Sequence, residues 1–227
     1  MIMYMKNPNT STKTIRSFLA ILLLSSFLYF LPNTISARDH MNDNSKNWMH
    51  FNLGDVQNKD GTQVIAQKLH ILLKQHAVVG GIAFVKLYDQ NPDFERLNEE
   101  VKKNTQALTE TIGYLYGEEK KDDFKELWEK HIQLLTDHTI ATREQNQSKK
   151  QETINNLQIV TDQLSLFFAS NGHIPKEEIA GVLKIHIDQE KAIIDNAGAH
   201  NQNEIVSLLI QAGNHADMMA DMVLKNK

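Results

Sequence analysis

The chain has 227 residues, no cysteine and a formal net charge of −4 at pH 7. Without cysteine it can form neither a disulfide nor a lipid attachment through cysteine. The excess of acidic residues argues against a nucleic-acid-binding protein, which needs a basic face for the phosphate backbone. The composition is that of an ordinary globular protein, and the length can support one substantial core.

Residues 1–37 have the pattern of a secretory signal peptide: basic residues, an apolar run at 18–31, and small residues ending at Ala37. The run is shorter than the roughly 20 residues of a membrane-spanning helix. We therefore expect cleavage after Ala37 and a secreted or cell-envelope protein without a stable membrane span. An uncleaved anchor is the alternative, because Ile35 is bulky for its position before the cut. Cleavage leaves 21 basic against 28 acidic residues, a net charge of −7.

Residues 38–61 are polar and rich in Asn and Asp, which indicates a linker or arm. A small apolar group around Trp48 and Phe51 could pin this arm to the domain that follows. From residue 62 onward, apolar residues recur at spacings of three and four, the pattern of amphipathic helices. The predicted organisation is a signal peptide at 1–37, a polar linker at 38–61 and a helical domain at 62–227.

Residues that start and stop helices divide the predicted domain into six helices. In chain order, the predicted boundaries are Asn91-Pro92 at the start of the second helix, Gly117 at its end, Asp122 or Asp123 at the start of the third, residues 142–150 as the bend before the fourth, Asn171-Gly172 as a left-handed cap of the fourth, Pro175 at the start of the fifth, Gly198 near its end, and 204–225 as the sixth. No strand-like alternation with turn signals occurs, so the predicted class is all-α.

Three histidines recur with a period of 55 residues: His76 in LLKQHA, His131 in LWEKHI and His186 in VLKIHI. A repeat of this length is typical of one helical hairpin built several times. We therefore predict an all-α bundle of about six helices, arranged as three pseudo-repeated antiparallel hairpins. The second helices repeat less cleanly, although a shift of 111 residues pairs Asn104 with His215. Coincidence is the alternative, because any two amphipathic helices share a 3.6-residue pattern.

The repeated histidines are candidate metal ligands. The residues three and four positions before each are apolar, so His76, His131 and His186 lie on or beside a buried face. Together with His215 they predict a site for a metal that imidazole binds, such as copper or zinc. Met218 and Met219 would favour Cu(I). In the alternative, each histidine is hydrogen-bonded inside the core and the methionines fill gaps there.

The sequence contains no nucleophile elbow, glycine-rich phosphate loop or zinc-protease motif. None of the ten histidines has the preceding glutamate of a ferritin-like di-iron centre, and His186 with Glu190 is a fragment of the hemerythrin pattern without its companions. His131 and His138 share a helix face, and we expect one of them to face solvent. The prediction is a protein that is not an enzyme.

The runs LLKQHA, NTQALTETIGYLYG, LWEKHIQLLTDHT, LKIHI and AGNHADMMA resemble a family of exported bacterial all-helical proteins of no established activity. The resemblance spans about residues 64–224 as short motifs. In members of that family, the corresponding segments carry the histidines that stand here at His76, His131, His186 and His215. The resemblance implies an exported all-helical protein and implies no catalytic residue, substrate or cofactor.

Two functions follow from these observations. The first is an exported, non-enzymatic helical protein of the bacterial cell envelope or exterior, with a binding or structural role toward an unidentified protein or envelope partner. The second is an exported helical bundle that binds copper or zinc through the four histidines. Convergence of the histidines would favour the second function, and their dispersal through the core would favour the first.

Overall fold

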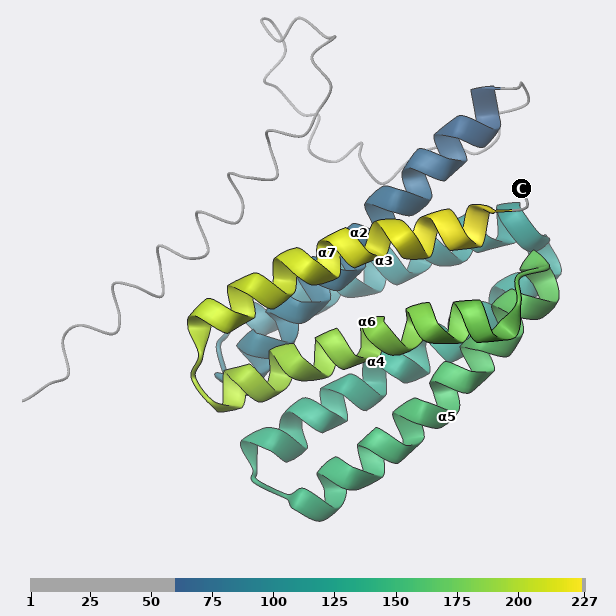
Figure 1. Ribbon diagram of the computed structural model, residues 1–227. Coiled ribbons are helices and arrows are strands. Elements are labelled where there is room, and N and C mark those ends of the chain that lie inside the picture. The colour runs from purple at the N-terminus through teal and green to yellow at the C-terminus, as the bar shows by residue number, and fades with distance from the viewer. Residues whose placement is uncertain (1–59, 226–227) are drawn as a thin grey trace, which may run out of the picture. The chain divides into compact units, whose positions relative to one another are not determined.

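The computed structural model describes residues 60–225, so the predicted signal peptide and nearly all of the predicted linker lie outside the described residues. Within the described range the chain is helical and contains no strand. The helices are α2 (Asp60–Tyr88), α3 (Asp93–Tyr116), α4 (Lys121–Arg143), α5 (Gln147–Gly172), α6 (Lys176–Gly198) and α7 (Gln202–Leu224), with a short 3-10 turn, η4 (Glu118–Lys120), before α4 (Figure 1). The predicted all-α bundle of six helices is confirmed.

Three inner helices organise the bundle. Helices α2, α4 and α6 contact one another pairwise, and each also packs along the helix that follows it in the chain, α3, α5 or α7. Helix α2 packs in addition along α7, and α5 along α6 (Figure 1). Any side chain on the shared face of the three inner helices therefore points toward the centre of the bundle.

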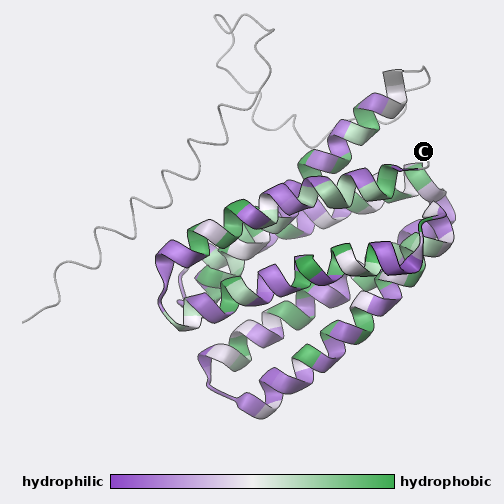
Figure 2. Ribbon diagram, in the orientation of Figure 1, coloured by the Kyte–Doolittle hydropathy of each residue, from purple (hydrophilic) through white to green (hydrophobic). Residues whose placement is uncertain are grey.

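The core forms because each helix carries one apolar face and one polar face (Figure 2). Phe124 and Trp128 of α4 stack with ring centroids 5.2 Å apart, and both are buried. Leu108 and Ile112 of α3 and Leu164 of α5 join them in the main apolar cluster. Each such side chain contributes roughly 1.5–3 kcal/mol when it is fully buried.

The three hairpins close through turns of the same conformation. Gln90, Gln145 and His200, spaced 55 residues apart, are non-glycine residues with left-handed φ values of 51°, 55° and 55°. The asparagine after each of them donates its backbone N–H to the carbonyl five residues earlier, at 2.9 Å in all three turns. Its side-chain oxygen then accepts a backbone N–H from the first turn of the next helix. Each turn thus combines a Schellman-type helix end with an asparagine cap.

Two predicted boundaries differ from the structure. The polar stretch 142–150 is mostly helical, because Asn146 caps α5 directly and only three residues separate it from α4. The left-handed residue after α5 is His173, with φ 54°, whereas Gly172 is the last helical residue. Gly172 meets a packing requirement instead: a Cβ there would lie 2.9 Å from the Tyr116 hydroxyl.

By length and composition, the segment Gln63–Tyr88 of α2 could cross a membrane. In the bundle, α2 packs against α3, α4, α6 and α7. This central position accounts for its apolar composition.

Candidate metal centre

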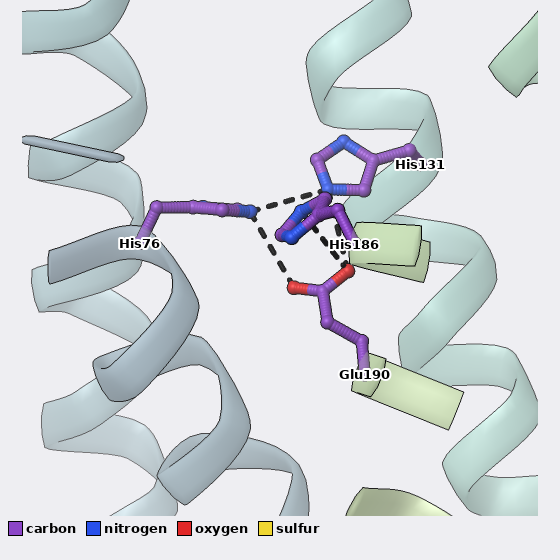
Figure 3. Close-up of side chains that lie close together, drawn as sticks. All are labelled: His76, His131, His186 and Glu190. Atoms are coloured by element: carbon purple, nitrogen blue, oxygen red, sulfur yellow. Dashed lines mark hydrogen bonds and ion pairs between the residues drawn. The ribbon is translucent and has the colours of Figure 1, made fainter. Parts of the chain in front are cut away.

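The three repeated histidines meet in the middle of the bundle. His76 comes from α2, His131 from α4 and His186 from α6, and each side chain is almost completely buried (Figure 3). Each stands one helical turn after a pair of apolar residues, so the apolar face that packs the inner helices also carries the imidazole inward. The structure thus brings together three of the four predicted ligands.

Glu190 supplies a fourth polar group, one turn after His186 on α6. Its side chain is 0% exposed. The carboxylate oxygens lie 3.6 Å from His76 Nε2, 3.9 Å from His131 Nε2 and 3.3 Å from His186 Nε2. The Nε2 atoms of His76 and His131 lie 3.2 Å apart, at hydrogen-bond distance (Figure 3). The centre of the bundle therefore holds three imidazoles and one carboxyl group.

These distances match the spacing of metal ligands. One ligand atom from each of the four residues can be chosen so that all lie within 4.8 Å of one another. A tetrahedral zinc ion with ligands at about 2.0–2.1 Å places neighbouring ligand atoms about 3.3–3.4 Å apart. The four closest contacts, from 3.2 to 3.9 Å, bracket this value. Small side-chain rotations would complete such a site.

Burial keeps these groups neutral when no cation is bound. Desolvation lowers the pKa of His76 and of His186 well below its usual range, and neighbouring imidazoles add to the effect. Desolvation also lowers the pKa of His131 to about 4, against a smaller opposing effect of the Trp128 backbone. The pKa of Glu190 is raised well above its ordinary value by burial. Neutral imidazole is the form that binds metals.

Several of these buried polar atoms lack hydrogen-bond partners among the described residues. They include both oxygens of Glu190 and both ring nitrogens of His186. Leaving a buried polar group unpaired costs about 1–3 kcal/mol. Coordination of a cation would satisfy the carboxylate and one nitrogen of each imidazole at the same time.

Trp128 forms one wall of the centre. Its ring centroid lies 4.7 Å from that of His76 and 4.6 Å from that of His131, and its plane is within 6° of that of His186 at 6.4 Å. The indole thus contacts the two nearer imidazoles and helps to keep water away from the four polar side chains. Electrostatic interactions are strengthened in such a dry environment.

His215, the fourth predicted ligand, lies outside this group of side chains. Its Nε2–H donates a hydrogen bond to the backbone carbonyl of Val182 at 2.8 Å. Met218 is 56% exposed at the surface, whereas Met219 is packed in the apolar core. The structure therefore does not gather the histidine and thioether set that would favour Cu(I).

Glu190 was noted in the sequence only as part of an incomplete motif. The available signal was its spacing: a residue four positions after His186 lies on the same helix face. Carboxylates are seldom buried, so composition alone does not single it out.

His138 is fully buried, so the expectation that either His131 or His138 faces solvent was wrong. The Thr153 hydroxyl donates to the Lys150 carbonyl at 2.7 Å and accepts a hydrogen bond from His138 Nδ1 at 3.0 Å. His138 Nε2 lies 3.7 Å from the Asp195 carboxylate. Partners on α5 and α6 make this burial tolerable, and the pattern of α4 alone does not reveal them.

No protein-family model, curated protein or solved structure matches this chain. The functional argument therefore rests on the geometry of the four buried side chains.

Proposed function

We propose that this protein binds one divalent transition-metal ion through His76, His131, His186 and Glu190. The observation that carries the proposal is the buried carboxyl group of Glu190. It is 0% exposed, lacks hydrogen-bond partners among the described residues, and lies within 3.9 Å of three imidazole nitrogens. A cation would balance the carboxylate charge and turn four groups that are costly to bury into ligands.

The ligand types favour zinc as the first candidate ion. Three imidazole nitrogens and one carboxylate oxygen suit zinc, and also ferrous iron or nickel, whereas calcium and magnesium prefer oxygen ligands throughout. Cu(I) prefers thioether or thiolate ligands. The chain has no cysteine, and Met218 and Met219 point elsewhere.

The proposed role of the ion is to hold three helices together without catalysis. Four protein ligands, all buried, resemble a closed structural zinc site more than a catalytic site with an open position. Each inner helix contributes at least one ligand, so the ion would link α2, α4 and α6. With the predicted signal peptide, the proposal is an exported metal-binding helical bundle. Clustering of three histidines supports this function over the purely surface-acting one.

Metal analysis of untagged protein, purified without chelator, tests the proposal. We expect about one zinc ion per chain and, after metal removal, a rise in melting temperature when zinc is added back. His76→Gln and Glu190→Gln should abolish that rise. His70→Gln is the matched control, because His70 also lies on α2 but pairs with Asp217 at the surface. Absence of bound metal, together with no thermal shift by zinc, copper, nickel or iron, would refute the proposal.

A further inference from the structure

Two of the outer helices donate side-chain hydrogen bonds to backbone carbonyls of the inner helices. On α3, Asn104 Nδ2 donates to the Leu72 carbonyl at 2.9 Å, and Leu72 stands four residues before His76. On α7, His215 Nε2 donates to the Val182 carbonyl at 2.8 Å, and Val182 stands four residues before His186. Both donors are buried.

The position of these carbonyls links them to the ligands. In an α-helix, the carbonyl of one residue accepts the N–H of the residue four positions later. The carbonyls of Leu72 and Val182 therefore close the turns that carry His76 and His186. A second donor from the neighbouring helix fixes each of those turns, and with it the ligand, relative to the rest of the hairpin.

The two hydrogen bonds occupy corresponding places in their hairpins. The hairpin turns share one conformation and recur every 55 residues at Gln90, Gln145 and His200. A constant 14 residues separate each inner histidine from the left-handed residue of its turn: His76 from Gln90, His131 from Gln145, and His186 from His200. The sequence shift that pairs Asn104 with His215 therefore agrees with the backbone geometry.

We propose that the three hairpins are repeats of one structural unit, in which Asn104 and His215 are equivalent positioning residues that hold the turns bearing His76 and His186. This inference rests on the proposed metal-binding function. The middle hairpin differs, because Val160 stands where the other two have a donor. There the ligand is His131, whose imidazole packs against Trp128 one turn earlier on the same helix. His215 thus serves the metal centre without being a ligand.

The test uses Co²⁺ in the full chain, because its visible absorption reports ligand geometry and its affinity can be measured by titration. We expect Asn104→Leu and His215→Leu each to weaken Co²⁺ binding about tenfold or more and to change the absorption spectrum. Thr109→Val is the matched control on α3: Thr109 is buried, and its hydroxyl has no hydrogen-bond partner among the described residues. This variant should leave affinity and spectrum unchanged.

Exchanging the two side chains tests the equivalence directly. His215→Asn and Asn104→His should each keep Co²⁺ affinity within about threefold of the original chain, because both side chains can donate to the same carbonyl. These variants also decide the matter if the leucine variants do not fold. If the original chain binds Co²⁺ while the leucine variants bind it equally well with the same spectrum, or the exchanges lose affinity as the leucine variants do, the positioning role is overturned. No Co²⁺ binding by the original chain would overturn the proposed function itself.

Discussion

The Nε2 atoms of His76 and His131, which are 55 residues apart in the chain, lie 3.2 Å from each other in the dry centre of the bundle. At this distance one imidazole donates and the other accepts, so both must be neutral. Burial lowers the pKa of each ring, which is consistent with this arrangement. Coordination by both Nε2 atoms would require the shared proton to move to a ring nitrogen that faces away from the ion.

Replacing His131 should destabilise the fold. The side chain is 1% exposed and packs against Trp128, so His131→Ala creates a cavity and removes the hydrogen-bond partner of His76. We expect a loss of about 1–3 kcal/mol, measured by urea unfolding of the metal-free protein. Gln133→Ala, at an exposed position two residues later, should have almost no effect. An unchanged midpoint for His131→Ala would contradict the buried position.

Two adjacent glycines of α2 should respond oppositely to substitution by alanine. A Cβ on Gly81 would lie 2.6 Å from Leu209 Cδ2 and 3.1 Å from Ile193 Cδ1, whereas one on Gly80 meets no heavy atom within 4 Å. Gly80→Ala should stabilise the fold by up to about 1 kcal/mol through helix propensity. Gly81→Ala should cost about 1–3 kcal/mol through overpacking.

The same pair also tests how close α2 must approach the metal centre. Because Gly81 stands five residues after His76, pushing α2 away from α6 and α7 displaces a ligand. Zinc titration should show weaker binding for Gly81→Ala and unchanged binding for Gly80→Ala. Equal effects of the two variants on stability and on zinc affinity would mean that α2 does not depend on this contact.

Glu190→Gln should reverse its effect on stability when zinc is present. In the metal-free protein, burial raises the pKa of Glu190 above that of the unfolded chain, so the folded state keeps a proton that the unfolded state releases. The stability contributed by this proton is fully present below about pH 4.5 and is lost as pH rises toward the folded pKa. Glutamine has no such dependence.

Denaturation of both proteins between pH 5 and 8 measures the effect of Glu190. Without metal, Glu190→Gln should gain on the original protein by up to about 1.4 kcal/mol per pH unit. With saturating zinc, the original protein should be the more stable one, because only a carboxylate completes the site. A pH-independent difference in the metal-free proteins would show that Glu190 titrates as an exposed carboxyl group.

Export is tested outside the described residues. Mass spectrometry of the secreted protein should give Arg38 as the first residue, because small residues end at Ala37 after the apolar run. A membrane-retained form that begins at or near Met1 would contradict cleavage and support the uncleaved anchor.

Most of the fold could be predicted because helix periodicity and helix ends are local properties. Asn91-Pro92 and Gly117 mark the ends of α3 in the sequence, and the helix lies between them. The bend before α5 was predicted too long, because polarity shows exposure and does not distinguish an exposed helix end from a turn. Asn146 caps α5 early and converts most of that stretch into helix.

By itself, the sequence determined the six helices, their buried faces and the three inward histidines, since a 3.6-residue period fixes which side of a helix is apolar. Only the tertiary structure decided the fourth group of the centre. His215 lies on α7, outside the three inner helices, and its imidazole reaches the Val182 carbonyl, while Glu190 shares the inner face of α6 with His186. Periodicity gives a residue's direction around its own helix axis. It does not give the packing of helices against one another, which determines what that residue meets.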